Sequence, residues 1–215
     1  MIVPALNEAG HIGATLAALE PLRRAGHEVV VVDGGSDDGT AELAAGGCDS
    51  VVAARRGRAL QMNAGARAAT GDALVFLHAD TRLPADAETM VLAALKDHAW
   101  GRFDVRIEGR HRLLRLVACA MNLRSRLTGI ATGDQAIFVR RDAFAGFPEI
   151  ALMEDIAFSK LMKRAGWPAC LRARVTTSGR RWEERGVLRT ILLMWRLRLE
   201  YALGADPARL AERYR

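Results

Sequence analysis

The 215 residues of the sequence contain no long apolar run and only three cysteines. No stretch approaches the ~20 apolar residues that a membrane-spanning helix needs. The three cysteines, Cys48, Cys119 and Cys170, have neither metal-binding nor redox spacing, which favours free thiols in a reducing compartment. No basic segment precedes the first apolar residues, and Pro4 interrupts them, so no signal peptide is predicted. We therefore expect a cytoplasmic protein.

The chain also lacks a nucleic-acid recognition motif, although its net charge is +6. Residues 1–100 carry 8 Lys and Arg against 13 Asp and Glu, a net charge of −5. Residues 101–215 carry 23 against 12, a net charge of +11. The basic second half suggests an anionic partner, such as a membrane surface or a phosphorylated substrate. An arginine-rich surface without a partner explains the same counts, and nucleic acid is not predicted.

Short apolar runs alternate with amphipathic segments, a pattern typical of an α/β domain. We expect strands at residues 1–3, 28–33, 49–53, 73–77, 100–108, 136–139 and 170–176. We expect helices at residues 9–25, from about 40, and at 58–69, 85–98, 111–127, 154–164 and 187–203, with residues 180–182 in a loop. The prediction is one domain over residues 1–215, with a mostly parallel central sheet flanked by helices.

Two aspartates follow apolar strands of this predicted sheet. Asp80 comes just after the run 73–77, whose length and composition indicate a strand buried on both faces. In open α/β sheets ligands bind beyond the carboxyl ends of the strands, where an aspartate can hold a hard cation and, through it, a phosphate. A helix cap or an Asx-turn is an equally good explanation of Asp80. For Asp33, a hydrogen bond to a ligand competes with a structural role in the turn, and the glycines after it do not match the spacing of a dinucleotide motif.

Other charged residues lie where the same edge of the sheet should be. Arg55, Arg56 and Arg58 follow the third expected strand, and guanidinium groups there suit a diphosphate. Glu154 and Asp155 open a helix, a position that the helix dipole alone would favour for carboxylates.

Taken together, these segments resemble the family 2 glycosyltransferases with the GT-A fold, a Rossmann-like fold that binds nucleoside-diphosphate sugars. The resemblance covers nearly the whole chain. The matching elements are Val3–Glu8 (their "PxxNE"), Val31–Thr40 ("VDDGSxDGT"), His78–Asp80 (the DXD position), Glu154–Asp155 ("ED") and Arg181–Trp182 ("RW"). Segments 58–65, 76–81 and 133–135 are similar to a short, soluble bacterial subgroup.

For the donor side, the resemblance implies a nucleoside-diphosphate sugar as the substrate, bound within residues 1–100. Pro4, Ala5 and Glu8 would frame the nucleoside, and Asp33 would accept a hydrogen bond from the base. Asp80 would bind Mg²⁺ or Mn²⁺ held by the diphosphate.

For the acceptor side, the resemblance implies that residues 101–215 bind an acceptor hydroxyl. Asp155 would be the general base that deprotonates this hydroxyl, and the sugar would be inverted at its anomeric carbon. The further expected contacts are Gly133, Asp134, Gln135, Glu154, Arg181 and Trp182. Turn formation and packing explain these residues about as well.

The sequence departs from the family pattern at three positions. His78 replaces the first DXD acid, so the metal rests on Asp80 alone or takes His78 as a second ligand. Met62 stands where many members carry arginine, which leaves Arg58 or Arg56 to contact the diphosphate. Gly34 replaces the second acid of "VDD", which is expected to loosen nucleotide recognition.

Two other functions would also use a nucleotide-binding α/β fold. A nucleotidyltransferase usually has a glycine- and arginine-rich segment with a lysine after its first strand, and residues 4–8 do not fit that pattern. A non-catalytic nucleotide-binding protein would not need the base Asp155.

The sequence does not identify the acceptor, and a lipid-linked or an anionic acceptor is compatible with the basic second half. The expected amphipathic helix 187–203 has arginines among its apolar residues, as interfacial helices do. Peripheral contact with the inner face of a membrane is therefore one interpretation, and a C-terminal helix packed on the sheet is the other. The sequence is also compatible with a homodimer.

Overall fold

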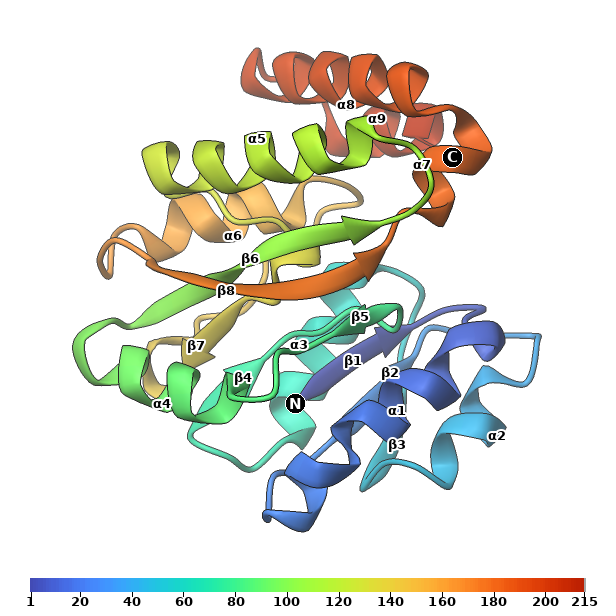
Figure 1. Ribbon diagram of the computed structural model, residues 1–215, viewed down its shortest axis with the longest axis vertical. Helices are drawn as coiled ribbons and strands as arrows, with labels where there is room; N and C mark the ends of the chain where they lie inside the picture. The colour runs from blue at the N-terminus through green and yellow to red at the C-terminus, as the bar shows by residue number, and fades with distance from the viewer. Residues whose placement is uncertain (215) are drawn as a thin grey trace.

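The computed structural model describes residues 1–214, which form an α/β fold (Figure 1). Its first sheet has the order β1-β2-β3 and is parallel throughout. These strands are β1 (Ile2–Ala5), β2 (Val30–Asp33) and β3 (Ser50–Ala53). The second sheet has the order β4-β7-β6-β8-β5 and is mixed. Its strands are β4 (Ala73–Val75), β5 (Thr81–Arg82), β6 (Trp100–Glu108), β7 (Phe138–Arg140) and β8 (Ala169–Ser178).

The segment that continues β4 joins the two sheets. The Leu77 amide donates to the Ile2 carbonyl at 2.9 Å, and the Phe76 amide donates to the Ile137 carbonyl at 2.8 Å. Phe76 also forms a parallel bridge with Ile2. Phe76 and Leu77 are buried, as expected for a central strand covered on both faces. Asp80 therefore follows a central strand, as the sequence predicted.

The helices cover both faces of the sheet because alternate strand residues point to opposite sides. Val29 and Val31 pack in one apolar cluster, and Val30 and Val32 pack in the other. The first cluster is completed by α1 (Ala9–Arg24), α4 (Ala87–Asp97) and α5 (Leu113–Thr128). The second is completed by α3 (Arg58–Ala68) and α6 (Glu154–Met162). The short helix α2 (Thr40–Ala45) precedes β3.

The C-terminal part differs most from the sequence expectation. Residues 180–182 were predicted as a loop but belong to helix α7 (Arg180–Arg185). Helix α8 (Val187–Ala202) was predicted, whereas α9 (Pro207–Tyr214) was not. Leu197 and Leu210 of these two helices pack on residues at the start of α6, in a third apolar cluster. None of the described helices is long and apolar enough to cross a membrane.

The expected strand 136–139 is shifted in the structure. A 3₁₀ turn, Gly133–Gln135, precedes it, and Ala136 has a left-handed backbone with φ of 46°. A residue in that conformation cannot continue a strand, so β7 begins only at Phe138. This turn brings Gly133 and Asp134 to the carboxyl edge of the sheet.

Candidate active site

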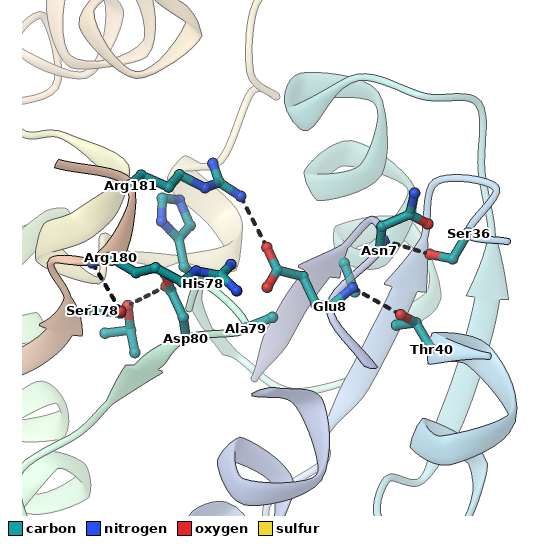
Figure 2. A network of polar contacts seen from close by, with 12 residues as sticks. Asn7, Glu8, Ser36, Thr40, His78, Ala79, Asp80, Ser178, Arg180 and Arg181 are labelled. Carbon is teal, nitrogen blue, oxygen red and sulfur yellow. Dashed lines mark hydrogen bonds and ion pairs between the residues drawn. The ribbon is translucent and has the colours of Figure 1, made fainter. Parts of the chain in front are cut away.

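Two loops at the carboxyl ends of β1 and β2 are tied together by hydrogen bonds (Figure 2). The Asn7 amide donates to Ser36 Oγ at 3.0 Å, and the Glu8 amide donates to Thr40 Oγ1 at 2.8 Å. Ala5 lies at the end of β1, paired with Asp33 of β2, and Pro4 precedes it within the strand. The residues predicted to frame a nucleoside therefore lie together on these two hydrogen-bonded loops. We call the surface formed by residues 4–8 and 33–40 the ledge.

Asp33 uses its carboxylate to close the turn that follows β2. It accepts hydrogen bonds from the amides of Gly35 and Ser36, at 3.0 Å each, and from the Ser36 hydroxyl. The Asp33 side chain is 8% exposed. The Asp33 carboxylate therefore stabilises the turn. A hydrogen bond from a base would use the remaining acceptor capacity of the same carboxylate.

The glycine that replaces the second family acid is required by a neighbouring side chain. A Cβ on Gly34 would stand 2.9 Å from Gln61 Nε2. Gln61 is buried and donates to the carbonyls of Ala5 and Val32, at 2.7 and 3.0 Å. Gln61 therefore occupies the space that a side chain at position 34 would need.

An ion pair joins the first loop to the C-terminal part of the chain. Arg181 Nη2 of α7 donates to Glu8 Oε1 at 3.0 Å, across 173 positions of sequence (Figure 2). The second oxygen of Glu8, Oε2, is buried and has no hydrogen-bond partner among the described residues. Arg181 thus reaches the loop after β1, whereas the adjacent Trp182 packs against the first apolar cluster.

His78 and Asp80 follow the central strand but point to different partners. His78 Nδ1 lies 3.3 Å from Asp134 Oδ1. Its Nε2 lies 2.4 Å from the point where a Cβ on Gly133 would stand, so glycine is needed there. Within residues 1–214, the hydrogen bonds of Asp80 Oδ1 are two long ones, of 3.4 Å, from the hydroxyls of Thr81 and Thr177. His78 therefore supports the 133–135 turn, and the Asp80 carboxylate keeps capacity for another partner.

The three residues of this turn have different surroundings. Gln135 is fully buried, accepts from the Thr132 amide at 3.1 Å and donates to Asn122 at 3.3 Å, so it holds the turn from inside. Asp134 faces His78. Burial acts to raise its pKa, but the contact with His78 and the nearby charges of arginines hold the pKa of Asp134 below its usual value.

Asp155 lies in the first turn of α6, on the other side of the 133–135 turn. Its Oδ2 accepts from the Gly133 amide at 3.2 Å, and its Oδ1 accepts from the Ile156 amide at 2.7 Å. Burial and the adjacent Glu154 carboxylate raise the pKa of Asp155 to about 6, against the opposing effect of those two amides and of Arg58. A carboxylate with such a pKa is suited to take a proton near neutral pH.

Arg58 is the arginine that shares this space with the acids. It is the first residue of α3, and the charges of Glu154, Asp134 and Asp155 act on it. Burial acts to lower the pKa of Arg58, but these acids and Tyr214 raise it above its usual value. Met62, where many relatives carry arginine, is buried in the second apolar cluster. Of the two arginines expected to contact a diphosphate, Arg58 is therefore one that lies close to these acids.

Sequence reasoning missed Arg124 of α5, because a single arginine in an arginine-rich helix carries no distinguishing signal. Burial lowers its pKa, and the charges of Asp155 and Asp134 oppose that effect, which places Arg124 beside the two acids. Its Nε and Nη2 are buried and have no hydrogen-bond partner among the described residues. These two atoms form the edge of a guanidinium group that binds carboxylate or phosphate with two parallel hydrogen bonds.

The site fits a divalent cation that is shared with a substrate. Among residues 1–214 no group of three or more His, Cys, Asp and Glu side chains could hold a metal by itself. Mg²⁺ commonly takes only one or two carboxylates and completes its shell with phosphate oxygens and water. Asp80, with its two long contacts to neutral hydroxyls, is suited to be that single carboxylate.

The parallel first sheet, the paired loops and the acidic helix start define an α/β protein whose polar side chains gather at the carboxyl ends of its strands. The sequence model described as "Glycosyl transferase family 2" matches residues 1–152. This match covers more than half of the chain, which therefore belongs to the family 2 glycosyltransferases. A search of curated proteins finds no match.

Solved structures share the fold. Mannosyl-3-phosphoglycerate synthase from Rubrobacter xylanophilus is 20% identical with a TM-score of 0.60, over 95% of this chain and 75% of that one. Glucosyl-3-phosphoglycerate synthase from Mycobacterium tuberculosis, with Mn²⁺ and UDP-glucose, is 19% identical with a TM-score of 0.59, over 82% and 68%. A mycobacterial protein at 20% identity and a TM-score of 0.56 is matched over 82% of this chain and 63% of its own. The chain thus spans less than two thirds of that last protein.

Proposed function

We propose that the protein transfers a sugar from a nucleoside diphosphate to an acceptor hydroxyl, with inversion at the anomeric carbon and with Asp155 as the general base. The observation that carries this proposal is the placement of Asp155. Its carboxylate has a raised pKa, contacts the 133–135 turn, and so lies across that turn from His78 at the end of the central strand. A carboxylate that removes the proton of the acceptor hydroxyl makes the hydroxyl oxygen more nucleophilic as this oxygen attacks the anomeric carbon.

The donor would lie on the ledge formed by the β1 and β2 loops. Pro4, Ala5 and Glu8 would border the nucleoside, and Asp33 would meet the base. The Arg181–Glu8 ion pair supports this arrangement, because it closes the C-terminal part of the chain onto the ledge.

Charge on the leaving diphosphate would be neutralised by Arg58 and by a divalent cation. Mg²⁺ or Mn²⁺ held at Asp80 would supply electrostatic stabilisation of the developing negative charge. Arg58 would contribute fixed positive charge on the same side. The solved relatives with Mn²⁺ or Mg²⁺ and UDP support this expectation.

The acceptor would be an anion held by Arg124. The support is the unpartnered Nε and Nη2 edge of this arginine beside Asp155 and Asp134. A related fold was crystallised with phosphoglyceric acid. An acceptor with a phosphate or carboxylate group would fill the free edge of Arg124 and bring its hydroxyl to Asp155.

Thermal unfolding with a panel of nucleoside diphosphates tests the donor side. We expect one nucleotide to raise the melting temperature with Mn²⁺ and not with EDTA, because only the folded state binds the ligand. Asp155→Asn should keep this shift and lose transfer. Retained transfer by that variant would overturn the role of Asp155, and a shift that ignores EDTA would overturn the role of Asp80.

Phosphoglyceric acid is the probe for the acceptor side. We expect it to raise the melting temperature of the nucleotide-bound wild type, and Arg124→Gln to remove that increase while keeping the nucleotide effect. Arg126→Gln is the matched control, since Arg126 is also on α5 but is paired with Asp104 at 2.7 Å. Equal stabilisation of all three proteins would contradict an anion site at Arg124.

The same proposal assigns donor binding to residues 1–100 and acceptor binding to residues 101–215. Family membership sets aside the nucleotidyltransferase alternative. The non-catalytic alternative predicts nucleotide binding without transfer by the wild type, which the experiments above distinguish.

A further inference from the structure

The C-terminal helix α8 has apolar residues on two opposite sides. Its inner side includes Leu197, which is fully buried against Met153 and Ile156. Its outer side carries a row that we call the outer stripe. The outer stripe consists of Leu188, Leu192, Trp195, Leu199 and Leu203. The spacing of three or four residues aligns these five side chains along one helix face, and they are 62 to 79% exposed.

Helix α5, next to α8, carries further exposed apolar residues. It contacts α8, and the two helices lie side by side along one edge of the molecule, far from β1, β2 and β3 (Figure 1). Leu116, Leu123 and Leu127 of α5 are 56 to 70% exposed. Exposed apolar residues scattered singly need no explanation, whereas eight on two adjacent helices mark a contact surface.

Positive charge accompanies the stripe. On α8, Arg189 and Arg196 lie on one flank of the outer stripe and Arg198 on the other, as the helical spacing of 100° per residue requires. The only acid of α8 is Glu200, which is already paired with Arg196 and Arg213. Helix α5 contains three arginines and no acidic residue. An apolar stripe between arginines is the pattern of a helix that lies in the plane of an anionic membrane surface.

We propose that the α5–α8 surface docks the protein on an anionic lipid bilayer, with the outer stripe inserted among the acyl chains and the flanking arginines against the headgroups. A two-fold contact between copies is the less suitable use of this surface. It would bring Arg189 and Arg196 of one copy close to the same arginines of the other, and like charges at a contact are unfavourable.

Docking would also orient the candidate active site. Tyr201, on the inner side of α8, lies near Asp155, since burial and the charge of Asp155 raise the pKa of Tyr201. Helix α8 therefore separates the membrane face from the acceptor side by the width of one helix. If the proposed function holds, a lipid-linked acceptor would find its hydroxyl site beside the bilayer. The docking itself does not depend on that function.

The test is cosedimentation of the full chain with vesicles of phosphatidylcholine and phosphatidylglycerol at low ionic strength. We expect binding that falls in high salt and on pure phosphatidylcholine. The triple variant Leu192→Gln, Trp195→Gln, Leu199→Gln should lose at least about tenfold in partition. Its matched control is Leu43→Gln, Leu92→Gln, Trp167→Gln, which alters the same residue types at other exposed positions and should bind as the wild type does.

Two further pairs of variants separate the contribution of charge from that of insertion. Arg189→Gln with Arg196→Gln should weaken binding by about fivefold for each arginine. The control pair Arg67→Gln with Arg172→Gln, which are exposed elsewhere, should weaken it less. Trp195→Phe should abolish the shift of tryptophan emission on vesicle addition, and Trp167→Phe should retain it.

Circular dichroism establishes that each variant is folded. Absence of wild-type binding to the anionic vesicles at low ionic strength would overturn the proposal. So would a wild-type dimer that the triple variant converts to a monomer, because the stripe would then be an interface between copies. Equal loss in the triple variant and its control would show that general hydrophobicity, and not this surface, causes the binding. Because these readouts need no donor or acceptor, they can fail while the transferase assays succeed.

Discussion

Replacing Asp155 by asparagine should abolish transfer and yet stabilise the folded protein at neutral pH. The pKa of this carboxyl is raised from 3.8 to about 6 by burial and by the charge of Glu154. Two pKa units correspond to roughly 3 kcal/mol against the ionised form in the native state. Asparagine removes that charge but cannot accept from both the Gly133 and the Ile156 amides, which costs about 1 kcal/mol. About 2 kcal/mol should remain, a rise of roughly 4 to 8 °C in the melting temperature of a chain of this size.

The size of this stabilisation by Asp155→Asn depends on pH. Between pH 4 and 6 the native state holds a proton on Asp155 that the unfolded state has released, so wild-type stability falls as pH rises through this window. The advantage of Asp155→Asn should therefore be complete above pH 6 and absent below pH 4. Differential scanning fluorimetry of both proteins across this range measures it.

A control separates this effect from general surface charge. Asp142→Asn removes a carboxylate whose side chain is 71% exposed, so its effect on melting should be small at every pH. A melting temperature of Asp155→Asn at or below that of the wild type at pH 7.5 would refute the buried, raised-pKa carboxylate. A gain that persists at pH 4 would refute it as well.

Three other changes test neighbouring parts of the site. Glu154→Gln should move the acidic limb of the pH–kcat/KM profile to lower pH, because the Glu154 charge raises the pKa of Asp155; an unmoved limb would remove that coupling. Asp80→Ala should weaken nucleotide binding about tenfold or more in Mn²⁺ and little in EDTA, as titration calorimetry can measure, and equal losses would mean that Asp80 binds no metal. Gly34→Asp should lower stability by about 1 to 3 kcal/mol in urea unfolding, since its Cβ would collide with Gln61, and unchanged stability would contradict that packing.

Much of the fold follows from local pattern. Runs such as 73–77 and the valines from Val29 to Val32 are too short and too apolar for anything but buried strands, and both are central in the sheet. The expected order of strands and helices is confirmed for residues 1–77. The misses are the short strand β5, the turn at Ala136, and helices α7 and α9, which depend on contacts with distant segments more than on local propensity.

The sequence by itself determined which chemical groups stand at strand ends, and hence the family, the polar loops after β1 and β2, and the acid at the start of α6. Tertiary structure decided how these groups are used. The pairing of Arg181 with Glu8 spans 173 positions, and the raised pKa of Asp155 depends on burial beneath segments far away in the chain. Arg124 is distinguished from the other arginines only by the acids that the fold brings beside it. The burial of a side chain and the charges close to it depend on residues that folding brings together from distant parts of the chain. The local spacing of residues in the sequence does not contain this information.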